Sequence, residues 1–137
     1  MVDTRTTEPA NRAIEAARAE SSDDRARALV RLAQDLRQHG RAAVTLQVLD
    51  AAYQLFPSEE VRRAAYTCAI EAHCDLGHYV VAEVIEREQA SRSIDEAFAR
   101  AALRLYSALS RWTGFESHYG RRADYILLLG RRPAAVG

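Results

Sequence analysis

The chain has 137 residues and a formal net charge of zero, with 19 cations balancing 19 carboxylates. Every cation is an arginine, which excludes P-loop nucleotide-binding proteins, protein kinases and enzymes that form a lysine Schiff base, because each class needs a lysine amine. The neutral balance also counts against nucleic acid as the main partner. Arginine and alanine richness is typical of a GC-rich genome, and we interpret the chain as bacterial.

The length predicts one domain. We expect a disordered N-terminus over residues 1–8, a single helical domain over residues 9–130 and a flexible tail over residues 131–137. The N-terminus lacks the apolar segment of a signal peptide, and the longest apolar run is the short stretch 125–129. The sequence therefore predicts a cytoplasmic protein without a membrane partner.

Helix signals follow one another along the whole domain. Residues 9–20 are rich in alanine and predict a first helix. Ser21 begins a second helix with a capping hydroxyl, and apolar residues recur at positions 29, 32, 33 and 36, the spacing of one helical face. Gly40 ends this helix, because glycine favours the left-handed cap.

The remaining helices are predicted in the same way. A third helix runs to Pro57, and a fourth begins at Ser58 and ends at Gly77. The fifth covers residues 78–90. A capping box of Ser93 and Glu96 begins the sixth, and the seventh covers about 115–129. No segment alternates with period two for long, so the fold class is all-α with about seven helices.

Three glycines recur at a spacing of 37 residues, at Gly40, Gly77 and Gly114. Each ends a long predicted helix and precedes a shorter one. A helical hairpin cannot bury its apolar faces alone, whereas stacked hairpins can, and about three are needed for stability. The spacing therefore predicts three stacked helix–turn–helix units after an N-terminal helix.

The first unit resembles the tetratricopeptide repeat (TPR) family. Its matching positions are Leu29, Leu32, Ala33, Leu36, Gly40, Leu49, Ala52 and Pro57. The second unit keeps Tyr66, Ala69, Ile70, Gly77, Tyr79 and Ala82, and the third keeps Leu103, Tyr106, Ser107 and Gly114. The units are longer than the usual repeat of about 34 residues, and Gln89 replaces a packing alanine. The resemblance implies a right-handed α-α superhelix over residues 25–129.

The resemblance also implies that the first helix of each unit lines a concave groove. The partner-binding residues that we carry over are Arg27, Arg31, Gln34, Arg37, Glu71, Arg104, Arg111 and Trp112. Five arginines outnumber the two acids at the groove positions, so an acidic peptide or a C-terminal carboxylate is the candidate ligand, with Trp112 as its anchor. The alternative is a solvated face on which these arginines pair with nearby acids.

Metal binding and catalysis have weaker signals. Cys68, His73, Cys74 and His78 form the one metal-like cluster, but helical geometry puts only Cys74 and His78 on the same face. No catalytic motif is present. We interpret the acids of the middle region as ordinary helix-surface residues: Asp35, Glu71, Asp75, Glu86 and Glu88. We therefore predict no metal, no cofactor and no enzymatic activity.

The C-terminal helix carries an apolar run that surrounds it on every side. Tyr125, Leu128 and Leu129 are therefore predicted to form an oligomer or partner surface, and a homodimer through this helix is a candidate. The alternative is that the N-terminal helix or the tail covers the run.

Together these patterns favour a non-catalytic protein-interaction module, either an adaptor or a small chaperone-like protein. A nucleic-acid-binding helical repeat and a small helical enzyme are the alternatives. The partner would be a protein or peptide held in the arginine-rich groove, on the C-terminal helix, or on both.

Overall fold

The computed structural model describes residues 9–15 and 21–131, and within these ranges all regular secondary structure is helical, which confirms the all-α prediction. Residues 9–15 form a helical segment. The helices that follow are α2 (Ser22–Gln38), α3 (Ala42–Tyr53), α4 (Glu59–Asp75), α5 (Tyr79–Ala90), α6 (Glu96–Thr113) and α7 (Glu116–Gly130). The predictions for residues 1–8, 16–20 and 132–137 fall outside the described residues.

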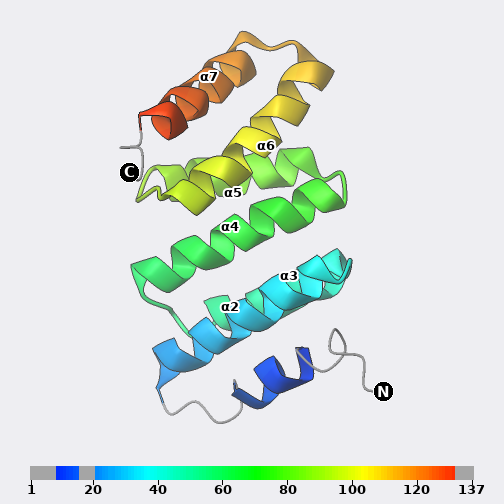
Figure 1. Ribbon diagram of the computed structural model, residues 1–137, viewed down its shortest axis with the longest axis vertical. Helices are drawn as coiled ribbons and strands as arrows, with labels where there is room; N and C mark the ends of the chain where they lie inside the picture. The colour runs from blue at the N-terminus through cyan, green and yellow to red at the C-terminus, as the bar shows by residue number, and fades with distance from the viewer. Residues whose placement is uncertain (1–8, 16–20, 132–137) are drawn as a thin grey trace.

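The helices pair as three hairpins that follow one another along the long axis of the molecule (Figure 1). The pairs are α2 with α3, α4 with α5 and α6 with α7. Between hairpins, α4 contacts both α2 and α6, so the first helices of the units lie side by side. The stacking of three units is as predicted, while the right-handed sense of the superhelix stays a prediction.

Side-chain caps begin three of the helices. Ser21 accepts a hydrogen bond from the Asp24 amide, and Ser58 accepts one from the Val61 amide, as the sequence predicted. The predicted capping box at Ser93 is wrong: α6 begins two residues later, with Asp95 as the cap that accepts from the Phe98 amide. Ser93 is used elsewhere, because its hydroxyl donates to Glu59.

The three repeated glycines share one backbone conformation. Gly40, Gly77 and Gly114 have φ values of 76°, 77° and 66°. These lie in the left-handed region that often ends a helix, and glycine adopts this conformation without steric strain because it has no Cβ. The predicted helix ends are therefore confirmed at these positions. Phe56, with φ 50°, is the one other described residue in this region, and it closes the turn before Pro57.

Two apolar clusters form the core. One joins α2, α3 and α4 around Leu49, and the other joins α4 to α7 around Phe98 and Leu105. The Ile85 side chain packs against both clusters, so it links the two halves of the stack. Among the described residues, no helix is long and apolar enough to cross a membrane.

Candidate functional site

A groove lies between α2 and α4, with a cavity volume of about 250 Å³. Its lining residues are Arg27, Val30, Arg31, Gln34, Glu60, Val61, Arg63, Ala64 and Asp95. Val30 and Val61 are buried, so they form an apolar floor, while the arginines and acids form charged walls. The structure thus brings together three of the predicted partner-binding residues, at positions 27, 31 and 34.

The charged side chains of this groove differ in their pairing. Arg27 lies 3.5 Å from Asp23 and 3.4 Å from Glu60. Arg63 lies 3.0 Å from Asp95. Arg31 is exposed and has neither an ion pair nor a side-chain hydrogen bond to any described residue. A ligand anion can therefore reach the Arg31 guanidinium without first displacing a carboxylate of the described chain.

Gln34 stands next to this arginine on the same face of α2, three residues further along. Its side chain is also exposed and has no hydrogen bond within the described part of the chain. A side-chain amide offers both a donor and an acceptor, so Gln34 can orient a second polar group of a ligand.

Further along the same face, the predicted binding residues are already paired with one another. Arg37 lies 3.0 Å from both Glu71 and Asp75, and Arg104 lies 2.8 Å from Asp75. These ion pairs cross from α2 to α4 and from α6 to α4. This half of the face therefore matches the alternative interpretation, a solvated face of mutually paired charges.

The two remaining groove predictions lie apart from the α2–α4 groove. Trp112 is 79% exposed in the last turn of α6. The Arg111 side chain donates to the backbone carbonyl of Ser107, 3.3 Å away on its own helix. Neither side chain lines the cavity that contains Arg31.

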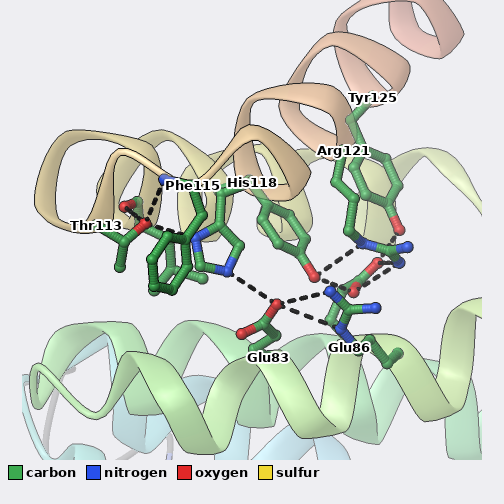
Figure 2. A network of polar contacts seen from close by, with 10 residues as sticks. Glu83, Glu86, Thr113, Phe115, His118, Arg121 and Tyr125 are labelled. Carbon is green, nitrogen blue, oxygen red and sulfur yellow. Dashed lines mark hydrogen bonds and ion pairs between the residues drawn. The ribbon is translucent and has the colours of Figure 1, made fainter.

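A buried polar network connects α5, α6 and α7 (Figure 2). Its centre is the Glu86 carboxylate, which is 0% exposed. One guanidinium nitrogen of Arg121 donates to both carboxylate oxygens, at 2.6 and 2.8 Å. The hydroxyls of Tyr106 and Tyr125 also donate to this carboxylate. The network therefore neutralises and hydrogen-bonds a charge that burial alone would strongly disfavour.

The prediction that Glu86 is a surface acid is wrong. In the 37-residue register, Glu86 occupies the place of Leu49, and both side chains are fully buried. The repeat therefore contained a signal for the burial of Glu86, because the equivalent position in the first unit is apolar. A pattern of charge alone could not show the partners that make this burial tolerable.

A second branch of the network holds the α6–α7 turn against α5. The buried His118 ring has one nitrogen 2.7 Å from the Thr113 hydroxyl and the other 3.1 Å from the Glu83 carboxylate. Arg87 approaches the same carboxylate at 3.0 Å. Figure 2 shows His118 and Arg121 reaching from α7 down to the two glutamates of α5.

The groups that contact Glu86 stay in their usual states at neutral pH: the two tyrosines protonated and neutral, and the arginine charged. Burial, with hydrogen bonding to Glu86, raises the pKa values of Tyr106 and Tyr125. Burial is the largest single effect and lowers the pKa of Arg121, but the hydrogen bonds and charge attraction of Glu86, together with Tyr106, outweigh it and raise the pKa. A general acid or base works best with a pKa near the operating pH, so this arrangement favours a structural role.

Tyr125 was predicted to lie on an oligomer or partner surface, but the structure buries it, because its hydroxyl reaches Glu86 and its ring stacks near Tyr106. Leu129 is half-buried against the same cluster, whereas Leu128 is exposed. Leu128 borders a small depression between α5 and α7, together with Ala90 and Ile94. The inward face of α7 is therefore largely used by its own hairpin stack.

The described residues contain no group of three or more His, Cys, Asp or Glu side chains arranged to hold a metal ion. Cys68 and Cys74 are both buried as free thiols, and burial raises their pKa values to about 12 and about 11. Burial, with the nearby His78, lowers the pKa of His73. The two cysteines pack in the core, whereas His73 is half-buried and His78 is exposed.

Comparisons of the chain with protein-family models, with curated proteins and with solved structures found no match. The interpretation of the groove therefore depends on its own geometry.

Proposed function

We propose that this protein is a non-catalytic, TPR-like interaction module that binds an acidic peptide segment or a C-terminal carboxylate in the α2–α4 groove. The observation that carries this proposal is Arg31, an exposed guanidinium over a groove with an apolar floor and no ion pair within the described chain. In this proposal the protein acts as an adaptor or small chaperone-like protein of the bacterial cytoplasm.

The groove offers each part that such a ligand needs. The Arg31 guanidinium can donate two parallel hydrogen bonds to a carboxylate, and such charge-assisted bonds are roughly twice as strong as neutral ones. Gln34 can bind an adjacent backbone amide of the peptide. An apolar peptide side chain can lie over Val30, Val61 and Ala64. The charges of Arg27 and Arg63 in the groove walls are neutralised by ion pairs with Glu60 and Asp95.

The test uses a fluorescent peptide with two glutamates followed by a C-terminal leucine, once with a free carboxylate and once as the amide. We expect saturable binding to the full chain by fluorescence anisotropy, weaker for the amide. Arg31→Ala is expected to weaken binding at least about tenfold, since a hydrogen bond to a charged group contributes about 1.5–3 kcal/mol.

Arg41→Ala is the matched control. Arg41 is also exposed and makes no side-chain cap for α3. It lies just after the C-terminal end of α2, outside the residues that line the groove. Equal losses in both variants would mean that only overall charge matters and would contradict the groove proposal. Tight, salt-sensitive binding of a single-stranded RNA probe that Arg31→Ala leaves unchanged would favour the nucleic-acid alternative instead.

The C-terminal helix is proposed as a second contact surface, for a protein partner or a homodimer. Because Tyr125 is buried, we place this proposed surface on the outward side of α7 instead of at Tyr125.

A further inference from the structure

The second helices of the first two hairpins bury the same three positions of the 37-residue register. In α3 these are Thr45, Leu49 and Ala52. In α5 they are Ala82, Glu86 and Gln89. All six side chains are 0% exposed. Thr45 and Gln89 form hydrogen bonds within their own hairpins, to Ala33 and Glu59. Glu86 accepts hydrogen bonds from α6 and α7 of the following hairpin, so these positions are buried inside the stack.

The same three positions on α7 are exposed. They are Tyr119, Ala123 and Ile126, and the side chains of Tyr119 and Ile126 are 51% and 43% exposed. Leu127, beside them, is 54% exposed. α7 lies at the end of the stack, and no further hairpin follows it among the described residues (Figure 1). Three register positions that are buried in α3 and α5 are therefore exposed in α7.

This face continues along the whole of α7. Its members recur at helical spacing and are all exposed: Glu116, Tyr119, Gly120, Ala123, Ile126, Leu127 and Gly130. We call these residues the outer stripe. It lies opposite the inward face of α7, on which His118 and Tyr125 are buried.

The outer stripe is complementary to itself when it is turned end to end. It has small residues at its centre, bulky residues on both sides of them, an acid at its first residue and Arg131 just after its last. In an antiparallel pair with Ala123 against Ala123, Tyr119 of one copy lies opposite Leu127 of the other, and Gly120 lies opposite Ile126. Glu116 then reaches Arg131 of the second copy.

We propose that the outer stripe binds the outer stripe of a second copy of this chain, as an antiparallel α7 pair with Ala123 on the twofold axis. Small central residues allow two helices to approach to about 8 Å, at the close end of helix packing. The space in front of the Gly120 Cα is free of other described residues, so this approach is open. The charge pairing at both ends selects the antiparallel orientation.

The pair uses one helix from each copy, so it buries less area than a standard interface of about 1,600 Å². The dimer is therefore concentration-dependent. Its helices differ from those of the α2–α4 groove, and its detection needs no peptide. Failure of the dimer and failure of peptide binding can thus be distinguished.

The first experiment is sedimentation velocity of the full chain from micromolar to sub-millimolar concentration. We expect the weight-average mass to rise from monomer toward dimer. Ala123→Glu places two acids against each other on the twofold axis and abolishes the rise. Ala51→Glu, on an exposed position of α3, is the matched control and leaves it unchanged. A monomer at every concentration, or a dimer that survives Ala123→Glu, overturns the proposal.

A charge exchange tests the orientation. Glu116→Arg is expected to shift dimerisation at least about tenfold to higher concentration, in the range of close interfacial charge pairs. The double variant Glu116→Arg with Arg131→Glu is expected to recover most of that loss. Absence of recovery contradicts the antiparallel register.

Direct cross-linking provides a readout that does not depend on affinity. Under mild oxidation, Ala123→Cys is expected to form a covalent dimer, because the two side chains meet on the axis. Ala51→Cys is expected to remain monomeric. The two native cysteines are buried and so do not compete. Equal cross-linking of both variants contradicts the proposed axis.

Discussion

The first two hairpins bury the same register positions with opposite chemistry. At the α3–α4 interface, Leu49 packs in an apolar cluster with Val30, Val61 and Ala65. At the α5–α6–α7 interface, Glu86 occupies the equivalent place and is held by Arg121 and two tyrosine hydroxyls. The backbone arrangement is thus compatible with either an apolar or an ionic centre.

The difference between these interfaces lies in what each requires of its neighbours. An apolar contact needs volume and tolerates side chains of similar size. A buried carboxylate needs its hydrogen-bonding and charged partners, because a buried charge left without them is strongly destabilising. The polar interface therefore joins α7 to α5 and α6 through directional hydrogen bonds, while the apolar interface contributes stability through buried area.

Glu86→Ala tests the polar interface and has the largest expected effect. It leaves the Arg121 charge and two buried hydroxyls without their acceptor, so we expect a loss of about 3–5 kcal/mol in the free energy of unfolding. Urea unfolding monitored by circular dichroism measures it. Glu86→Leu combined with Arg121→Met removes both charges and is expected to recover much of the loss. A single-variant loss below about 1 kcal/mol would contradict the comparison.

Leu49→Ala tests the apolar interface at the equivalent position. It removes a fully buried side chain and leaves a cavity, so we expect a loss of about 2–5 kcal/mol. Leu49→Met keeps the volume and is expected to cost less than about 1.5 kcal/mol. If urea unfolding showed the same loss of free energy of unfolding for Leu49→Met as for Leu49→Ala, the shape of the side chain rather than its volume would control the α3–α4 interface.

Gly40→Ala and Gly120→Ala compare a turn of the first hairpin with a helix of the last. Gly40 has φ 76°, so an alanine there is strained and we expect a loss of about 1–2 kcal/mol. Gly120 lies inside α7, where alanine is preferred, so we expect a gain of up to about 1 kcal/mol at low protein concentration. Thermal unfolding measures both, and a change of Tm in the same direction for the two variants would contradict the comparison.

The acid response of Glu59 has the smallest expected effect. Hydrogen bonds from Gln89, Ser93 and Arg62 lower the pKa of Glu59 from 4.5 to about 2. Because the folded pKa lies below the unfolded one, this carboxylate stabilises the fold above pH 4.5, and its contribution is lost as the pH falls toward 2. Urea unfolding across this range should show a smaller loss of stability for Glu59→Gln than for the unchanged chain. If the free energy of unfolding fell equally with pH in both proteins, this role of Glu59 would be contradicted.

Local signals in the sequence were sufficient for the helices and their order. The caps at Ser21 and Ser58 and the three glycine turns depend on nearest neighbours, so they could be predicted. The Ser93 cap was wrong because Asp95 offers an equally good acceptor two residues later. The sequence could not show that Glu59 accepts hydrogen bonds from Ser93 and Gln89, since these contacts join α4 to α5 and to the loop that follows α5.

The candidate sites were less predictable for the same reason. Arg31 and Arg37 have the same residue type on the same helix, yet only Arg37 finds acids on α4. Helix packing decides this difference. Tyr125 illustrates the converse, because its place in an apolar run suggested a surface while its hydroxyl has a buried acceptor. Only the repeat register pointed to the burial of Glu86.

The equal spacing of Gly40, Gly77 and Gly114 has a consequence for how this chain can change in length. The interval of 37 residues restores the left-handed turn at all three glycines and, from α3 to α5, the same three buried positions. A whole-unit insertion would therefore keep every helix facing the same kind of neighbour. An insertion of most other lengths would rotate one helix and expose its packing face, so growth of this architecture proceeds in steps of one unit.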